Sequence, residues 1–392
     1  MSVVNLKTLA PQDLERKVCV VIGTRPGIVM LSPVIRELAR RQLPCFVLHS
    51  GQHYSFNMDR QLMEELELRE PDYKLEAVRY AGLHGAQTAE MLRGCEEVFL
   101  HERPMLVLVG GDANTNLAGA LAARKLHIQV GHIEAGERSY DWRMPEEHNR
   151  VLIDHMSEYL FTTNEKGREN LVGDNVRGLI VITGNPIVDA TEQNLLIAES
   201  RSRLPKELGL SPGGYVVLTL HREENVDSPE TLADVLDGLR LLSDQLGSTI
   251  VFPVHPRTWR RLSEFGLAPR ANAIRGLVMT EALGYLDFLA LVARAGLVMT
   301  DSGGVQQESC ILGVPCVTLR ESTEWTETVE LGANVLAGTA PHGIVDAARK
   351  MLDASGRWPN PFGDGRAAVR IADTVAAALG SPIPMMAGEV QP

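Results

Sequence analysis

The feature that most constrains the fold of this chain is a repeated alternation of short apolar runs with longer amphipathic stretches. In the first half the runs are VCVVIG, CFVLHS, MLVLVGG, IQVGHI and YLFTTN, at residues 18–23, 45–50, 105–111, 128–133 and 159–164. In the second half they are YVVLTLH, TIVFPVH, GLVMTDSGG and PCVTLR, at residues 215–221, 249–255, 296–304 and 315–320. Strands that are buried on both faces of a parallel sheet form such continuous apolar runs. The pattern therefore predicts an α/β architecture with one doubly wound parallel sheet in each half.

The length of the chain favours two domains. At 392 residues it exceeds the size at which a single hydrophobic core stops growing. The stretch TGNPIVDA, at residues 183–190, lies between the two series of runs and contains glycine, asparagine and proline, which are typical of a turn. We therefore predict a Rossmann-like domain at 1–186, a second at 187–365, and a C-terminal helix and tail at 366–392. In two such domains that face each other, the ligand would lie in the cleft at the carboxyl ends of the strands.

The composition excludes several classes of protein. Hydrophobic residues make up 44% of the chain and charged residues 22%, as in ordinary globular proteins. The formal net charge of -12, without long runs of like charge, argues against a nucleic-acid surface or a polybasic membrane anchor. No apolar run approaches the length of a membrane span or a secretory signal. The five cysteines lack C-x-x-C spacing, which favours buried thiols in a reducing compartment, so we expect a cytoplasmic protein.

The second half contains a glycine-bearing loop that is suited to phosphate. The segment GLVMTDSGGVQQES, at residues 296–309, places Ser302, Gly303 and Gly304 between an apolar strand and a helix. Free backbone N–H groups at such a helix start favour a phosphate group. Glu308, about one turn into the helix, could accept hydrogen bonds from ribose hydroxyls. The alternative is a tight turn that a serine caps.

Acidic side chains follow two strands of the first half. Asp112 comes directly after the run at 105–111, and Glu134 follows the run at 128–133. This placement at strand ends favours a functional role. The segment that continues from Glu134 also contains Arg138, Asp141, Arg143, Glu146, Glu147 and Arg150. The alternative for this segment is a solvated loop whose surface ion pairs contribute little.

Basic residues occupy two further strand ends. Arg25 lies in the loop GTRPGIVM, at residues 23–30, and the pair His221 and Arg222 follows the run at 215–221. We expect His221 and Arg222 to face a substrate, whereas the alternative for the histidine is a local capping role. A metal site is the weaker interpretation of the remaining histidines, because no helical H-E-x-x-H pair or cysteine ligand accompanies them. The residues considered for metal were His132, Glu134, His148 and His155.

Nine ordered blocks carry a resemblance to a known family. They are GTRPGIVMLSP, GGDANTN, GHIEAGERS, MPEEHNR, TGNPIVDA, HREEN, FPVHP, TDSGGVQQES and NPFGDGRA. With these blocks in this order, the chain resembles the non-hydrolysing UDP-N-acetylglucosamine 2-epimerases over nearly its whole length. The resemblance implies two Rossmann-like domains in the arrangement of GT-B glycosyltransferases. It further implies a homodimer that acts on a UDP-sugar, with no redox cofactor and no metal.

The resemblance also implies roles for individual residues. Asp112, Glu134 and Glu146 match the catalytic acids of the family, and His221 is expected to act beside the phosphates of the substrate. The remaining positions are expected to bind substrate. They are Arg25 at the diphosphate, Ser302, Gly303 and Gly304 at the phosphates, Glu308 at the ribose and Phe288 at the uracil. The expected reaction is the reversible conversion of UDP-N-acetylglucosamine, or a closely related UDP-2-acetamido sugar, into its C2 epimer.

Four positions depart from the pattern of the family. Gly27 replaces a glutamate, Met30 replaces a lysine or arginine, Gln307 replaces a glutamate and Trp325 replaces an arginine. The cations that could compensate are Arg138, Arg143, Arg150 and Arg320. Some bacterial members are activated by UDP-N-acetylglucosamine at a second site. This chain keeps the matching Gln52, His53 and Arg93 but has Ser55 in place of a glutamine, so we expect weak or absent activation.

Two other functions fit the same features. A GT-B scaffold also supports glycosyl transfer or hydrolysis of a UDP-sugar, because a fold alone does not determine a reaction. A non-catalytic sensor of UDP-sugars is the second alternative, and Met30 and Trp325 motivate it. Product identity and turnover distinguish these functions from epimerisation.

Overall fold

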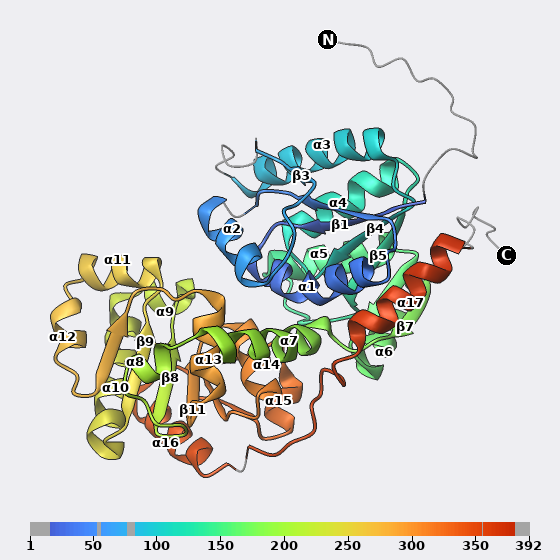
Figure 1. Cartoon of the computed structure of the whole chain (residues 1–392). Helices are drawn as coiled ribbons and strands as arrows, with labels where there is room; N and C mark the ends of the chain where they lie inside the picture. Colours follow the sequence, from blue (N-terminus) through green and yellow to red (C-terminus); the bar gives the residue numbers. More distant parts are fainter. Residues whose placement is uncertain (1–15, 53–55, 77–82, 355, 381–392) are drawn as a thin grey trace. The chain divides into compact units, whose positions relative to one another are not determined.

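The computed structural model describes residues 16–52, 56–76, 83–354 and 356–380. These residues separate into two compact units (Figure 1). Unit 1 holds the described residues up to Arg60, then Leu68–Thr183, then those from Ala368 onward, and unit 2 holds Gln61–Glu67 and Gly184–Ala367. His53 and Ser55, on which the prediction about activation depends, lie outside the described residues.

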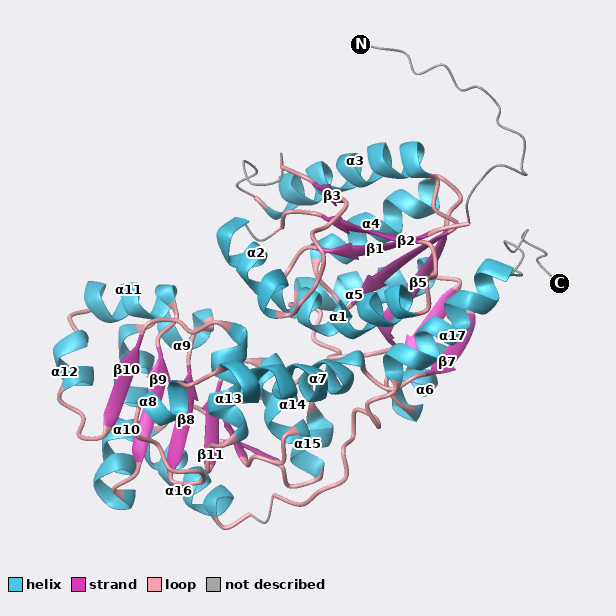
Figure 2. Ribbon diagram, viewed as in Figure 1, coloured by secondary structure: helices cyan, strands magenta, loops and turns pink. Residues whose placement is uncertain are grey.

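The sheet of unit 1 has seven strands, and every pairing in it is parallel (Figure 2). In spatial order the strands are β3 (Tyr73–Lys74), β2 (Cys45–His49), β1 (Val18–Ile22), β4 (Leu106–Gly110), β5 (Gln129–Ala135), β6 (Tyr159–Thr162) and β7 (Leu179–Ile182). All residues of β1 and β4 are buried, as their continuous apolar runs predicted. The chain order reverses between β1 and β4, which makes this the switch point of a doubly wound sheet.

Helices cover both faces of the unit 1 sheet. They are α1 (Arg25–Arg40), α3 (His84–Glu102), α4 (Asn114–Lys125), α5 (Pro145–Met156), α6 (Glu165–Gly173) and α17 (Ala367–Gly380). Helix α2 (Phe56–Glu65) begins in unit 1, and its residues from Gln61 belong to unit 2. Side chains of α3, α4 and α5 share one buried cluster with β1, β2 and β4. Helix α1 lies against β1 and β4 on the other face (Figure 1). The core of unit 1 therefore has the two apolar layers that a doubly wound sheet requires.

The sheet of unit 2 has six strands, again all parallel. Their spatial order is β10 (Leu277–Thr280), β9 (Thr249–Pro253), β8 (Tyr215–Thr219), β11 (Leu297–Thr300), β12 (Cys316–Thr318) and β13 (Asn334–Leu336). The switch point here lies between β8 and β11, so the residues that follow these two strands come together.

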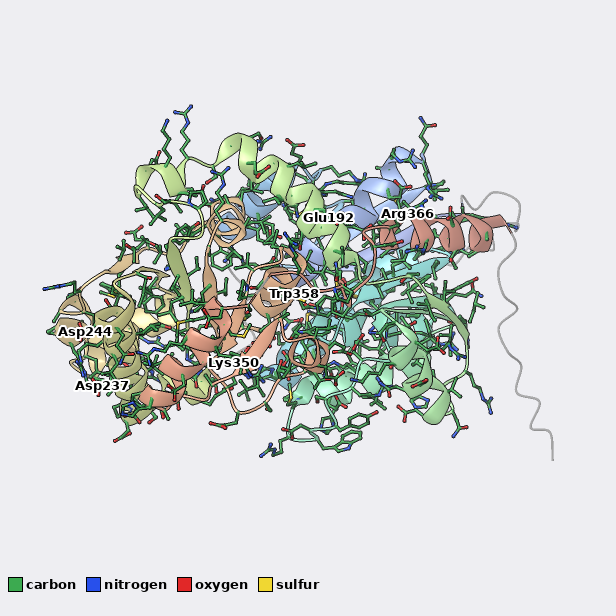
Figure 3. The ribbon with its side chains drawn as sticks, turned by 90° about the horizontal axis from the view of Figure 1, so that it is seen from below. Glu192, Asp237, Asp244, Lys350, Trp358 and Arg366 are labelled. Atoms are coloured by element: carbon green, nitrogen blue, oxygen red, sulfur yellow. The ribbon has the colours of Figure 1, made fainter. Side chains whose placement is uncertain are left out.

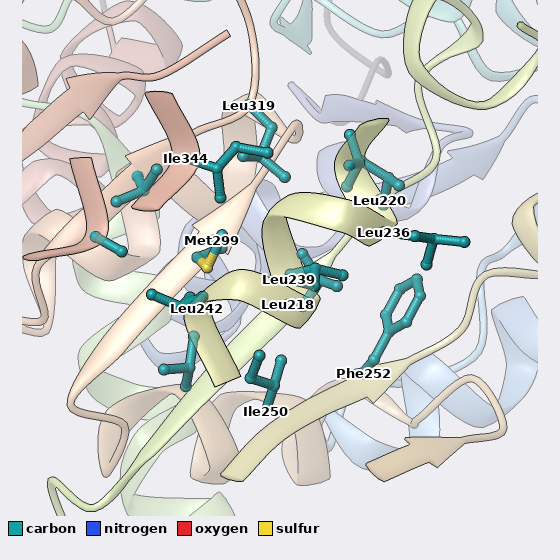
Figure 4. Close-up of a cluster of buried hydrophobic side chains, with 14 of the residues drawn as sticks. Leu218, Leu220, Leu236, Leu239, Leu242, Ile250, Phe252, Met299, Leu319 and Ile344 are labelled. Atoms are coloured by element: carbon teal, nitrogen blue, oxygen red, sulfur yellow. The ribbon is translucent and has the colours of Figure 1, made fainter. Parts of the chain in front are cut away.

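The helices of unit 2 lie on both sides of its sheet. They are α7 (Pro186–Arg201), α8 (Leu204–Glu207), α9 (Glu223–Val226), α10 (Pro229–Leu246), α11 (Pro256–Glu264), α12 (Ala268–Asn272), α13 (Tyr285–Ala293), α14 (Gly303–Ile311), α15 (Thr326–Glu330) and α16 (Pro341–Leu352). Helix α10 is amphipathic: Leu236, Leu239 and Leu242 enter the buried cluster in Figure 4, whereas Asp237 and Asp244 lie on its polar side (Figure 3).

Within the part of the chain that the structure describes, no helix combines the length and the apolar composition needed to cross a bilayer.

Candidate active site

In unit 1 the loop that follows β1 leads into α1, whose first residue is Arg25. Thr24 caps this helix, because its Oγ1 accepts a hydrogen bond of 3.2 Å from the backbone N–H of Gly27. Gly23 allows close packing here, since a Cβ at this position would lie 2.0 Å from Ser50 Oγ and 2.5 Å from Thr115 Oγ1. The partly exposed Arg25 is the first residue of α1, at the helix end that favours an anion.

Asp112 follows β4 and is held by residues of α5. Its carboxylate pairs with the guanidinium of Arg150, and its backbone carbonyl accepts a 2.7 Å hydrogen bond from Asn149 Nδ2. Arg150 also pairs with Glu147 at 2.9 Å. Burial alone would lower the pKa of Arg150, but the surrounding carboxylates, with Asp112 the strongest, raise it above its ordinary value. Arg150 therefore stays charged and fixes the position of Asp112.

Glu134 lies at a β-bulge near the end of β5. Pairing with β6 shifts register between Ile133 and Ala135, and Glu134 has the left-handed φ of +72°. Such a conformation is costly for a residue other than glycine, and it marks functional sites when the surroundings enforce it. A Cβ added to Gly111 would lie 3.2 Å from Glu134 Oε2. The carboxylate of Glu134 thus lies against the residue that precedes Asp112, and the structure brings these two predicted acids together.

Two adjacent glutamates in the first turn of α5 have different environments. Glu147 is buried and accepts hydrogen bonds of 2.9 Å from the backbone N–H groups of Ser139 and Tyr140. Burial raises the pKa of Glu147, but the hydrogen bonds from Ser139, Tyr140 and Arg150 outweigh burial and lower it. Glu146 is exposed, one turn before Arg150 on the same helix. Glu147 therefore fixes a loop, whereas the side chain of Glu146 is accessible to a ligand.

In unit 2 a buried aspartate organises the switch point. Asp301 Oδ2 accepts 2.9 Å hydrogen bonds from the backbone N–H groups of His221 and Arg222 and a 3.2 Å hydrogen bond from Asn225 Nδ2. His221 Nδ1 lies 3.1 Å from Asp301 Oδ1. Burial raises the pKa of Asp301, but its contacts with His221 and Arg222 lower it below the ordinary value. Asp301 is therefore a carboxylate that holds the loop bearing the two predicted basic residues.

The start of α14 has the geometry expected of an anion site. Ser302 is the N-cap residue, but its side chain makes no capping hydrogen bond. Ser302 thus occupies the N-cap position of the tight turn without a hydrogen bond from its side chain to the helix. A Cβ on Gly303 would lie 2.2 Å from Glu324 Oε1 and 3.2 Å from Trp325 Nε1, whereas one on Gly304 would meet nothing within 4 Å. The first turn of α14 is thus bordered by Glu324 and Trp325 on one side and open beside Gly304.

Basic side chains hold Glu324 in place. Arg320 Nη1 lies 2.9 Å from Glu324 Oε2, and Arg222 Nη2 lies 3.6 Å from its Oε1. Burial raises the pKa of Glu324, but these two arginines contribute to lowering it. Two cations and one carboxylate therefore gather beside the start of α14.

Glu308 and Phe288 lie on neighbouring elements of unit 2. Glu308 is buried in α14, and burial raises its pKa to about 7, while the side chain of Tyr285 opposes the rise. Phe288 is partly buried on α13 and packs against the cluster around β8 and β11. Each hydroxyl of a diol can donate a hydrogen bond, so a carboxyl group can accept from both hydroxyls.

The four departures from the family pattern lie in defined environments. Gly27 belongs to the capped start of α1, and the buried Met30 points its Cε toward Gly111, 3.7 Å from a Cβ added there. Gln307 is buried in α14. Trp325 is 9% exposed and packs edge-on against Phe362 with ring centroids 5.4 Å apart. Trp325 is therefore a core residue whose indole nitrogen still borders Gly303.

The four candidate compensating cations all pair with carboxylates. Arg138 lies 2.7 Å from Asp154 and Arg143 lies 2.7 Å from Asp141. Arg150 and Arg320 make the contacts described above. Of the four, Arg320 borders the start of α14 through Glu324, and Arg150 meets Asp112 directly.

Sequence reasoning gave no specific role to several residues that shape these sites. They are Asp301 and Glu324, together with Arg150, for which the sequence suggested only a compensating charge. The signal for Asp301 was its place directly between an apolar strand and a helix, as for Asp112. Glu324 carries no such signal, because its contacts with Arg222 and Gly303 join segments far apart in the sequence.

Comparisons with known proteins agree with this architecture. Residues 36–376 match the family described as UDP-N-acetylglucosamine 2-epimerase. The UDP-N-acetylglucosamine 2-epimerase of Methanococcus maripaludis is 48% identical, covering 92% of this chain and 98% of that protein. The protein of the same name from Methanocaldococcus jannaschii is 46% identical, covering 91% and 97%. The UDP-2,3-diacetamido-2,3-dideoxy-D-glucuronate 2-epimerase of Pseudomonas aeruginosa is 39% identical, covering 92% and 99%.

Solved structures show the same fold. The crystal structure of the Methanocaldococcus jannaschii UDP-GlcNAc 2-epimerase in complex with UDP-GlcNAc and UDP has a TM-score of 0.84 and 45% identity, covering 92% of this chain and 99% of that one. The calicheamicin glycosyltransferase CalG4 has a TM-score of 0.56 at 14% identity, covering 94% and 100%, and shows a likeness of fold alone. The prediction of two Rossmann-like domains of GT-B type is confirmed. The chain belongs to the UDP-N-acetylglucosamine 2-epimerase family, whose members are isomerases.

Proposed function

We propose that this protein catalyses the reversible C2 epimerisation of UDP-N-acetylglucosamine to UDP-N-acetylmannosamine, with the acids of unit 1 transferring the proton. The observation that carries the proposal is the strained Glu134, whose carboxylate lies against Gly111, directly before Asp112. Identities of 48% and 46% to epimerases over more than nine-tenths of the chain support the same reaction.

The chemistry explains why several acids are needed. The C2 proton of the sugar is not next to a carbonyl, so its removal is coupled to breaking the C1–O bond. The electron pair of the C2–H bond forms a C1–C2 double bond, and UDP leaves with the electron pair of the C1–O bond. The proton then returns to C2 on the opposite face while the UDP oxygen attacks C1. One group removes the proton and another delivers it, so at least two acid/base groups act.

We assign these roles to residues on strand and helix ends. Asp112, Glu134 and Glu146 are the acid/base candidates, and His221 acts beside the phosphates. Arg25, Arg222 and the first turn of α14 hold the diphosphate, because each presents positive charge or free N–H groups. That turn comprises Ser302, Gly303 and Gly304. Glu308 binds the ribose diol, and Phe288 stacks with the uracil.

One relative supports a second candidate substrate. The Pseudomonas aeruginosa relative, at 39% identity, carries the name of a 2-epimerase of a UDP-2,3-diacetamido sugar acid. A closely related UDP-2-acetamido sugar is therefore the second candidate substrate, and it requires the same elimination and re-addition. We also propose a homodimer and a cytoplasmic location, which the five free cysteines favour.

Proton exchange in deuterated water tests the reaction. Incubation with UDP-N-acetylglucosamine, or with a UDP-2,3-diacetamido sugar acid, should place deuterium at C2 and yield the C2 epimer, read by NMR. Free sugar would indicate hydrolysis, and a glycosylated acceptor would indicate transfer. Binding of UDP-sugars without exchange or product would indicate a sensor and overturn the proposal.

Acid-to-amide variants test the assignment of the catalytic groups. Glu134→Gln and Asp112→Asn should each lower kcat by roughly two to four powers of ten, as loss of a proton-transfer group does. Glu165→Gln is the matched control, since Glu165 lies exposed in the first turn of α6 and pairs with a surface arginine, Arg168. Equal losses in the control and in the site variants would contradict the assignment.

A further inference from the structure

His132 and Asp154 form a fully buried pair in unit 1. The proposed mechanism, in which Glu134 and Asp112 transfer the proton, gives this pair no role. His132 is on β5 and Asp154 is on α5, with His132 Nδ1 2.7 Å from Asp154 Oδ1. Neither side chain has any exposed surface. Burial of ionisable groups is costly, so a pair of this kind is retained only where its contacts are fully used.

The two oxygens of Asp154 hold the chain on both sides of Glu134. Oδ1 meets His132, two residues before Glu134, and Oδ2 accepts a 3.2 Å hydrogen bond from the backbone N–H of Gly136, two residues after it. Arg138 Nη1 also lies 2.7 Å from Oδ2. Glu134, between these two anchors, has the left-handed φ of +72°. A strained conformation of this kind persists only when its surroundings enforce it, and Asp154 supplies the enforcing contacts.

His132 connects Asp154 to the residue that precedes Asp112. Its Nε2 lies 3.2 Å from the carbonyl oxygen of Gly111, which directly precedes Asp112. A carbonyl oxygen can only accept, so Nε2 carries a hydrogen. Arg138 and the Gly136 N–H both donate to Asp154, so both oxygens of this carboxyl group are engaged. His132 thus links Asp154 to the chain beside Asp112 through its two ring nitrogens.

We infer that Asp154 and His132 form a positioning unit that sets the geometry of Glu134 and Asp112 without touching the substrate. The inference rests on the proposed function, because it assumes that these two acids transfer the proton. A misplacement of about 1 Å in a reacting group costs about 10²-fold in rate. Loss of the unit should therefore lower the rate of the chemical step and leave substrate binding almost unchanged.

Two substitutions and one control test the inference. Asp154→Asn and His132→Gln should each lower kcat by about 10- to 100-fold, with KM and the Kd of UDP within about threefold of the wild type. Val130→Ala is the control, because Val130 lies on the same face of β5, two residues earlier, and is equally buried. We expect this control to lower the melting temperature but to retain kcat. A loss of kcat in Val130→Ala as large as in the two variants would overturn the inference.

A double substitution separates positioning from general loss of stability. In a Glu134→Gln background, Asp154→Asn should cost less activity than it does in the wild type, because the part of its effect that acts through the Glu134 carboxylate is already gone. Additive losses would overturn the inference.

An NMR readout does not depend on turnover. In protein labelled with 15N-histidine, the ring signal that His132→Gln removes should show a hydrogen on Nε2, which donates to the carbonyl of Gly111. A signal without a hydrogen on that nitrogen would overturn the hydrogen-bond assignment. If the wild type shows no epimerisation or exchange, the proposed function fails, whereas the state of the pair is still read by this signal.

Discussion

At the scale of single residues, Glu308 shows how burial adapts a carboxyl group to its partner. It lies in the interior of unit 2, and burial raises its pKa to about 7. In the unfolded chain the pKa of the same group is the ordinary value of 4.5. The folded state therefore binds more protons than the unfolded state between these two values, so this group reduces stability as the pH rises through that window.

The pH dependence of unfolding checks this property. Glu308→Gln removes this titration. The free energy of unfolding of the variant, relative to that of the wild type, should therefore rise by about 2 kcal/mol from pH 5 to pH 8. Urea unfolding followed by tryptophan fluorescence at both pH values measures the change, and three of the four tryptophans, Trp259, Trp325 and Trp358, lie in unit 2. A difference between variant and wild type that stays constant with pH would contradict the raised pKa.

Residue types and strand ends allowed part of the candidate site to be predicted, but not its electrostatics. Asp112 and Glu134 were predicted from their places after apolar runs, and they lie together. Glu146 and Glu147 are neighbours with the same side chain, and only the backbone N–H groups of the loop at 139–140 decide that Glu147 is the buried one. The same stretch, residues 130–150, also contains His132 and Arg138, which belong to an internal network around Asp154. Such pairings join distant segments, so sequence spacing does not show them.

At the scale of elements, the start of α14 depends on a glycine. Gly303 leaves room for Glu324 and Trp325, whose side chains would meet a Cβ at 2.2 Å and 3.2 Å. The two side chains come from the loop between β12 and α15, which Thr323 anchors through a 2.6 Å hydrogen bond to Gln306 of α14. The loop therefore cannot retreat without breaking that contact.

Gly303→Ala should weaken UDP binding through this crowding. Overpacking of this kind costs about 1 to 3 kcal/mol, so we expect the Kd of UDP to rise by about tenfold or more in calorimetry. Gly173→Ala is the matched control, since Gly173 also lies in a helix and an added Cβ would meet nothing within 4 Å. Unchanged UDP binding in Gly303→Ala would show that the crowded side does not take part in the anion site.

Strands could be predicted from the sequence where both of their faces are buried. The runs at 18–23 and 105–111 correspond to the fully buried β1 and β4. The runs did not include β10 and β13, which lie at the two edges of the unit 2 sheet. Strand β10 is only partly buried throughout and β13 has three residues, so neither produces a long apolar run.

At the scale of the whole molecule, the C-terminal helix α17 belongs to unit 1, the unit that also contains the first strands of the chain. The described residues from Ala368 onward group with unit 1, although the preceding Gly184–Ala367 belong to unit 2. Arg370 Nη1 donates a 3.0 Å hydrogen bond to the carbonyl of Thr183, and Asp373 pairs with Arg41 at 2.6 Å. Ile371 and Val375 have no exposed surface. The last helix therefore completes the core of unit 1.

Substitutions in α17 should affect unit 1 alone. Ile371→Ala should lower the free energy of unfolding by about 2 to 5 kcal/mol, as for other buried isoleucines. Asp373→Ala is the control, because its side chain is 64% exposed and such a surface pair contributes about 1 kcal/mol or less. Hydrogen exchange followed by mass spectrometry should show faster exchange in peptides of unit 1 in Ile371→Ala and unchanged exchange in unit 2. Faster exchange confined to unit 2 would contradict the grouping.

The return of the chain at Ala368 also affects the order in which the protein is made. On the ribosome, the strands of unit 1 emerge first, but the helix that covers part of their core emerges only after all of Gly184–Ala367. At about 5 to 20 residues per second, the interval lasts roughly 10 to 40 s. During that time the nascent unit 1 exposes the apolar surface that Ile371 and Val375 later bury. Nearly all of unit 2 is translated before the final helix. The half of the enzyme whose synthesis begins first is therefore completed last.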